Sequence, residues 1–174
     1  MFKFTFFILL TSIAITSPAK SKKAELLVQS KEDVEFVAAT KSPFLDFAKS
    51  KDFVGYFNRP NEASKDLSRV DVYIPPAKSE ITMNKEICEE ILTGIFGPLK
   101  KGTLKYKGAT LFIGHTGKTC EAQFDDPDKE ALYPERHAIV GFIRMKPVAL
   151  VFRLSKKSAD SDRRNMKTFW NTLR

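Results

Sequence analysis

The two histidines of the chain, His115 and His137, are the side chains best suited to acid–base or metal chemistry near neutral pH. They lie far apart and show neither His-x-x-x-His nor His–Cys spacing. A zinc site would therefore have to be assembled from scattered carboxylates. We expect both to be ordinary surface histidines, and the sequence predicts no metal site and no cofactor.

A string at residues 114–119, Gly-His-Thr-Gly-Lys-Thr, ends like a loop that binds nucleotide phosphates. The spacing is wrong, because that motif requires a glycine five residues before Gly117, where this chain has Phe112. The residues that follow also lack the apolar pattern of the helix that such a loop precedes. We interpret the string as a hairpin turn in which Gly117 takes a positive φ and Lys118 is a surface residue.

Three carboxylates, Asp126, Asp128 and Glu130, alternate as they do at the start of a calcium loop. Ala131 replaces the glycine that such a loop needs for its sharp turn, and a histidine stands where the closing glutamate belongs. Capping of a helical turn around Pro127 is the better interpretation. Weak calcium binding at millimolar concentrations is the alternative.

No pattern identifies a catalytic group. The chain has no Gly-x-Ser-x-Gly elbow, and any two of its 21 acidic residues could converge as a glycosidase pair without leaving a signal in the sequence. We therefore nominate no catalytic residue. The enzymatic alternative is a small secreted hydrolase, which would be favoured by a pocket that brings either histidine within hydrogen-bond reach of a carboxylate.

The first 19 residues have the anatomy of a secretory signal peptide. Lys3 supplies the positive start, residues 4–15 carry no charge, and Ser17 and Ala19 place small residues at the −3 and −1 positions of a cleavage site. The apolar run is too short to cross a bilayer, which takes about 20 residues. We expect cleavage after Ala19 and export to a periplasm or to the outside of the cell.

Cys88 and Cys120 are the only cysteines, and both fall on apolar faces. Cys88 belongs to the apolar stripe of a predicted helix, whereas Cys120 alternates with Ala122 and Phe124 on a predicted strand. In the oxidising compartment that the leader implies, we predict a Cys88–Cys120 disulfide that joins the helix to the sheet. Two buried free thiols are the alternative.

Apolar periodicity and turn residues predict the elements that must position these groups. Strands are expected at 25–29, 33–38, 69–74, 104–107, 109–114, 118–124, 138–145 and 148–154, with the last two paired as neighbours. Helices are expected from 84 to 96, after Ser158, and as one or two short helices between 43 and 57, with a further helical turn at 126–133.

The strands cluster into hairpins, whereas the helices arrive singly, each with one apolar stripe. This pattern predicts an α+β fold: a mostly antiparallel sheet with about three helices packed on it. No repeat or linker divides residues 20–174, so we expect a single compact domain. A composition of 43% hydrophobic and 29% charged residues excludes a disordered chain and a membrane protein with many spans.

The formal net charge of +8 favours anionic partners in general. If the 104–124 hairpin and the last helix lie close together, their basic residues form an anion-binding patch. Its members would be Lys105, Lys107, Lys156, Lys157, Arg163, Arg164 and Lys167. An exported protein meets little nucleic acid, so the expected partner is an anionic envelope component or another envelope protein. An ordinary solvated surface is the alternative.

The last helix carries Met166, Phe169, Trp170 and Leu173 on one face, beside several basic residues. We expect this stripe to pack on the sheet, with no stable membrane insertion. Lying on a membrane surface is the alternative. Together these features predict a small exported binding or accessory protein of the cell envelope or extracellular space.

The leader makes the first testable prediction. Protein recovered from the exported fraction should begin at Lys20, because the cleavage site follows Ala19. N-terminal sequencing or intact mass measures this directly. An uncut chain retained in the cytosol with both thiols reduced would contradict the prediction.

Overall fold

The computed structural model describes residues 26–29, 35–38, 44, 46–52, 54–58, 68–76, 82–128, 130–157 and 159–173. The predicted leader, residues 1–19, lies outside the described residues. Two helices are described, α1 (Lys85–Phe96) and α2 (Ala159–Thr172). The strands are β1 (Leu26–Gln29), β2 (Glu35–Ala38), β3 (Asp46–Lys49), β4 (Gly55–Asn58), β5 (Arg69–Tyr73), β6 (Lys105–Gly114), β7 (Gly117–Asp125), β8 (Glu135–Ile143) and β9 (Lys146–Leu154).

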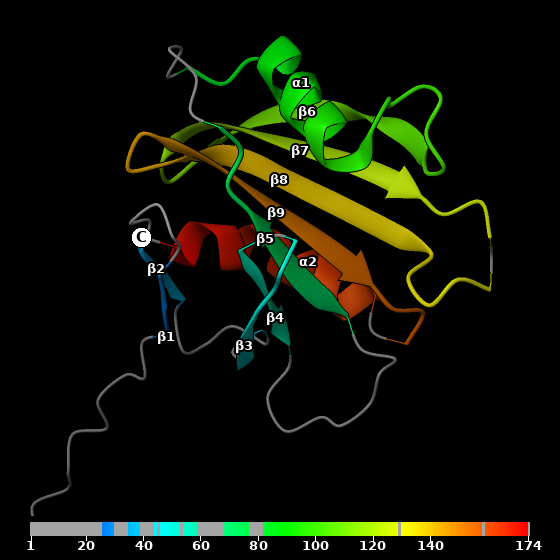
Figure 1. Ribbon diagram of the computed structural model, residues 1–174, viewed down its shortest axis with the longest axis horizontal. Coiled ribbons are helices and arrows are strands. Elements are labelled where there is room, and N and C mark those ends of the chain that lie inside the picture. The colour runs from blue at the N-terminus through cyan, green and yellow to red at the C-terminus, as the bar shows by residue number, and fades with distance from the viewer. Residues whose placement is uncertain are drawn as a thin grey trace, which may run out of the picture.

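Seven strands form one sheet in the order β3-β4-β5-β9-β8-β7-β6, and every neighbouring pair is antiparallel. The order joins two meanders, β3-β4-β5 and β6-β7-β8-β9, through the β5–β9 pair in the middle. The chain leaves β5, forms α1 and enters the sheet again at its far edge as β6 (Figure 1). Strands β1 and β2 form a separate antiparallel hairpin.

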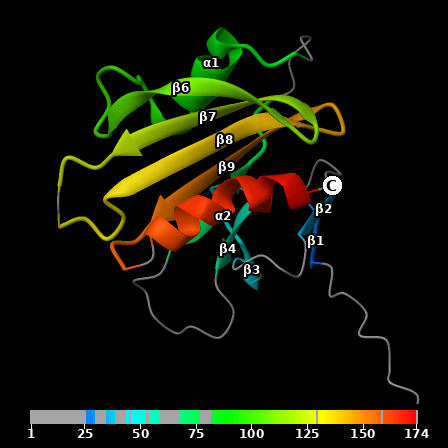
Figure 2. The same cartoon turned by 180° about the vertical axis from the view of Figure 1, so that it is seen from behind.

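The helices cover opposite faces of the sheet, α1 over the β6–β8 half and α2 behind it (Figures 1 and 2). The layer under α1 holds Ile87, Cys88, Ile91 and Leu92 against side chains of β7, β8 and β9. The layer under α2 holds Met166, Phe169, Trp170 and Leu173 against Phe57, Val70, Ile139, Leu150 and Phe152, among others. The structure is therefore a single α+β domain with a large antiparallel sheet.

Helix α1 follows the local signals of the sequence. The Asn84 side chain accepts a hydrogen bond from the Ile87 backbone N–H at 2.8 Å, which satisfies one of the free donors of the first turn. The helix ends at Gly97, whose φ of 78° is readily available only to glycine. The predicted helix at 84–96 is confirmed.

The apolar stripe of α2 packs on the sheet, as predicted. Trp170 is fully buried and lies against Gly141 of β8, where an added Cβ would come within 2.5 Å of the indole ring. Because the whole stripe is already covered, it has no apolar face left for a membrane surface. In the part of the chain that the structure describes, neither helix is long and apolar enough to span a bilayer.

The short helices predicted between 43 and 57 are wrong. The described residues of this segment form β3 and β4, which pair with each other in the sheet. Phe47 and Phe57 are directly opposite and in contact, with ring centroids 5.0 Å apart. A run this short has no decisive periodicity, and cross-strand packing of its aromatic residues selects the strand.

The helical turn predicted at 126–133 is also wrong, since the described residues there form turns and bends. Asp126 accepts a hydrogen bond from the Asp128 backbone N–H at 3.1 Å, which closes a local turn and begins no helix. The described chain thus has two helices where about three were expected.

The predicted disulfide is confirmed. Cys88 of α1 and Cys120 of β7 are bonded, with their Cα atoms 6.2 Å apart, and both are fully buried. The bond ties the only helix on that face to the β7 strand beneath it, within the described residues.

Removal of this bond should lower stability without changing the fold. The cysteines are 32 residues apart, and opening a loop of this size costs roughly 3 to 4 kcal/mol in the chain-entropy model. Urea unfolding of the oxidised protein and of the double variant Cys88→Ala/Cys120→Ala would measure the difference in the free energy of unfolding. Equal midpoints would contradict the prediction.

Candidate functional site

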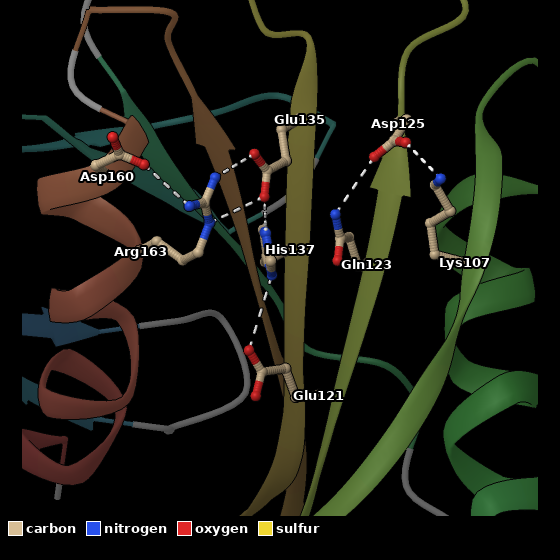
Figure 3. Close-up of polar contacts among 8 residues, drawn as sticks. All are labelled: Lys107, Glu121, Gln123, Asp125, Glu135, His137, Asp160 and Arg163. Carbon is tan, nitrogen blue, oxygen red and sulfur yellow. Dashed lines mark hydrogen bonds and ion pairs between the residues drawn. The ribbon is translucent and has the colours of Figure 1, made fainter.

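Polar side chains gather on the α2 face of the sheet, beyond the edge of the helix (Figure 3). Cys120, Ala122 and Phe124 of β7 point into the core under α1, so the alternate residues point to the opposite face. These residues are Glu121, Gln123 and Asp125, and they lie next to Glu135 and His137 of β8. We call this set, together with Lys107, Asp160, Arg163 and Lys167, the polar face.

His137 lies at the centre of the polar face and is only 5% exposed. Its Nε2 atom contacts Glu135 Oε1 in a short hydrogen bond, and its Nδ1 atom lies 3.7 Å from Glu121 Oε1. The expectation that His137 is a surface histidine is therefore wrong. The strand begins at Glu135, three residues before the predicted start, and this places Glu135 and His137 on the same face of β8.

Two basic residues of α2 bind the same pair of glutamates. Arg163 donates to Glu135 through Nη2 at 2.6 Å and through Nε at 3.1 Å, and also bonds Asp160 at 3.1 Å. Lys167 bonds Glu121 at 2.9 Å, and its ammonium lies 4.8 Å from the centroid of the Phe112 ring. The glutamates thus connect His137 to the helix that covers this face.

The electrostatics favour a charged triad. Burial alone would lower the pKa of His137, but the flanking carboxylates of Glu121 and Glu135 outweigh it and raise the pKa above its usual value of 6.5. The contact with His137 holds the pKa of Glu121 below its usual value, despite partial burial. Burial also opposes ionisation of Glu135, and Arg163 and His137 together lower its pKa.

This arrangement meets one condition for acid–base chemistry and fails two others. A histidine is within hydrogen-bond reach of a carboxylate, but each ring nitrogen faces a carboxylate, and the ring is buried. A raised pKa also favours the imidazolium, which cannot accept a proton. His137 is therefore arranged to hold α2 on the sheet through the two glutamates.

Only some of the basic residues predicted to form an anion-binding patch lie close together in the structure. Lys107 and Lys167 reach the polar face together with Arg163, because the β6–β7 hairpin and α2 do lie close together. Acidic residues separate them: Lys107 pairs with Asp125 at 3.0 Å, and Arg163 and Lys167 pair with the two glutamates. The face carries mixed charge.

The other predicted basic residues lie around this face. Lys156 and Lys157 are in the exposed turn between β9 and α2, where Lys156 pairs with Glu130 at 3.2 Å. Arg164 is exposed on α2, and Lys105 is exposed at the start of β6. Lys105 also lines a shallow pocket of about 530 Å³ with Leu99, Lys100, Leu104, Tyr106 and Pro127, and His137 is not part of its lining.

The remaining candidates behave as turn residues. His115 is exposed, and its Nε2 lies 2.6 Å from the Leu173 carbonyl oxygen. Gly117 has a φ of 109° at the β6–β7 turn, as predicted, and Lys118 is exposed. In the part of the chain that the structure describes, no three His, Cys, Asp or Glu side chains are grouped so that they could share a metal ion.

The polar face predicts how stability depends on pH. Because the pKa of His137 is raised on folding, its contribution is complete below about pH 6.5 and is lost as pH rises through the folded pKa. The free energy of unfolding should fall by about 1.4 kcal/mol for each unit of that increase. The glutamates act at acidic pH. Because folding lowers their pKa values, their contribution to stability is complete above about pH 4.5 and is lost as pH falls below it.

Urea unfolding between pH 6 and 9 measures the histidine contribution. The decrease should vanish in His137→Gln and persist in the matched variant His115→Gln. A decrease of equal size in both variants would contradict the assignment.

The fold is similar to a known structure, whereas the comparisons of the sequence with family models and with curated proteins found no match. No protein-family model matches the chain, and no curated protein matches it in sequence. Its fold is similar to the solution structure of cyanobacterial PsbP (CyanoP) from Synechocystis sp. PCC 6803, with a TM-score of 0.62 over 92% of this chain and 98% of that one. The sequences are 10% identical, so the similarity establishes a PsbP-like fold and nothing more.

Proposed function

We propose that this chain is an exported, non-catalytic accessory protein that binds an acidic partner protein along strand β6. The observation that carries the proposal is the exposed edge of the sheet. Strand β6 is the last of the seven, and its outer side pairs with no strand in the part of the chain that the structure describes.

Apolar side chains protrude along this edge. Leu111 is 44% exposed and Ile113 is 76% exposed, and both lie on the same side of the strand. A long edge strand with protruding apolar residues is an aggregation hazard that proteins usually blunt with charges or a covering segment. An edge of this kind is well suited to the addition of a partner strand, which satisfies its free backbone groups and covers its apolar side chains.

The charges around the edge indicate the chemistry of the partner. Lys118 lies directly opposite Ile113 on β7, and Lys105 and Lys107 lie at the other end of β6. The ion pair of Lys107 with Asp125 is exposed, so it contributes little and can be exchanged for a bond to an incoming carboxylate. The edge therefore suits an acidic segment.

In the same proposal, the seven basic residues predicted from the sequence supply positive charge around the binding edge. Lys156 and Lys157, in the turn before α2, and Arg164, on α2, are exposed and add positive charge to this side of the protein. The carboxylates among them favour a protein surface of mixed charge over a uniform polyanion such as lipopolysaccharide or a wall polymer.

Export is part of the proposal. The leader at residues 1–19 supplies the route, and the buried disulfide is a bond that persists in oxidising compartments. A histidine with each ring nitrogen facing a carboxylate supports a role in binding over the hydrolase alternative.

Photo-crosslinking in the cells that produce the protein tests the binding edge. A photo-reactive benzoylphenylalanine at position 113 should capture one abundant partner, which mass spectrometry would identify as a protein with an acidic segment. The matched position is 145, because Met145 is similarly exposed, at 68%, but lies in the turn between β8 and β9. Equal capture at both positions, or none at 113, would contradict the proposal.

A charge on the edge should abolish the complex without affecting the fold. Ile113→Lys places an ammonium where the partner strand would pack, so crosslinking from position 111 should fall by roughly tenfold or more, whereas Met145→Lys should leave it unchanged. Urea midpoints of both variants would confirm that the protein remains folded.

A further inference from the structure

Three arginines lie in a row across the neighbouring strands β5, β9 and β8, near one end of each strand and on the face that α1 covers only in part. Arg153 of β9 is directly opposite Arg69 of β5 on one side and Arg136 of β8 on the other. Like charges at directly opposite positions of neighbouring strands destabilise a sheet. The repulsion between these three arginines therefore lowers the stability of the sheet.

Two carboxylates offset the three guanidinium groups. Asp71 is fully buried, accepts a hydrogen bond from Arg153 and forms an ion pair with Arg69, whose Nε lies 2.9 Å from Asp71 Oδ1. Asp126 pairs with Arg136 at 3.2 Å. Among the described residues the row therefore retains one uncompensated positive charge, which Arg69 and Arg153 share because both pair with the single carboxylate of Asp71.

Arg136 keeps an unsatisfied donor although it is paired with Asp126. Its Nε is buried without a hydrogen-bond partner, as is that of Arg69, and burial followed by the charge of Arg153 lowers the pKa of Arg136. An arginine N–H that is withdrawn from water and left unpaired costs free energy.

The surrounding residues hold the row in place and leave it open to solvent. Arg69 packs over the Tyr56 ring at 5.0 Å and near the Tyr133 ring at 6.0 Å. The side chains of the three arginines are 27%, 23% and 21% exposed for Arg69, Arg153 and Arg136 respectively. The arginine side chains are therefore partly exposed on a fixed framework, and such pre-organisation favours binding.

We propose that Arg136 and Arg153 form a binding site for a small oxyanion, of the carboxylate or phosphate type, on the α1 side of the sheet. Two neighbouring guanidinium groups present N–H donors in the forked geometry that such oxyanions accept in pairs. One negative group would neutralise the remaining charge and relieve the repulsion between the two arginines. The site is separate from β6 and does not depend on the proposed partner.

Nuclear magnetic resonance titration of the protein tests the site. Inorganic phosphate and succinate would be added separately, with sodium chloride matched for ionic strength as the reference. The Nε–Hε resonances of Arg136 and Arg153 should shift in a saturable manner with at least one oxyanion, while that of Arg164, on the other face, should not. The anion that binds more tightly identifies the source as a phosphate or a carboxylate group.

Variants separate the site from general electrostatics. Arg136→Gln should weaken binding by roughly tenfold, the loss expected for one charged hydrogen-bonding group, whereas Arg164→Gln removes the same charge and should bind as the parent does. Arg136→Lys keeps the charge without the fork and should also bind several-fold more weakly.

Two results would overturn the proposal. One is the absence of saturable shifts at Arg136 and Arg153 with either anion, which needs no variant. The other is equal weakening of binding in Arg136→Gln and Arg164→Gln, which would indicate nonspecific attraction to a basic protein.

Discussion

Strands β8 and β9 are buried on both faces, and the rest of the structure depends on this constraint. From His137 to Ile143 and from Pro147 to Phe152 every residue is buried, so no alternate residue of either strand is left for water. A sheet with such a centre requires a covering layer on each side. Helix α1, tied by a disulfide, supplies one layer, and α2, with its aromatic stripe, supplies the other.

Polar side chains are excluded from that centre and gather on the parts of the sheet that the helices do not cover. On the α2 side they form the triad of Glu121, His137 and Glu135, which basic residues of α2 bind. On the α1 side they form the arginine row around the buried Asp71. The two sets use opposite faces of β8, the strand that contributes to both. One holds a helix in place, and the other retains a positive charge that no element of the described chain neutralises.

The sequence predicted the parts of this structure that depend on local patterns. The helix at 84–96 has a cap, a stripe and a terminating glycine, and the pairing of 138–145 with 148–154 follows from two strong apolar runs around Lys146 and Pro147. The disulfide followed from two cysteines on apolar faces. The run at 44–57 was wrongly predicted as helical because its aromatic residues are placed by tertiary packing. Phe44 and Phe57 contact Phe169 of α2, and Phe47 contacts Phe57 across the β3–β4 pair.

The polar sites could not be predicted, because both depend on register. His137 and Glu135 share a face only if β8 begins at residue 135, and their partner Glu121 lies on another strand. The arginine row unites residues 69, 136 and 153, whose alignment exists only once β5, β9 and β8 are paired. The basic patch was anticipated as lysines and arginines alone, since the acids that separate them are brought in by folding.

Native-state hydrogen exchange of the free protein tests the central claim, that a doubly covered centre supports an open edge at β6. Amides of β8 and β9 should exchange slowest, near the rate set by global unfolding, whereas the β6 amides that point away from β7 should exchange orders of magnitude faster. If every amide of β6 were as protected as those of β8, the edge would already be covered, and the claim of an open binding edge would be contradicted.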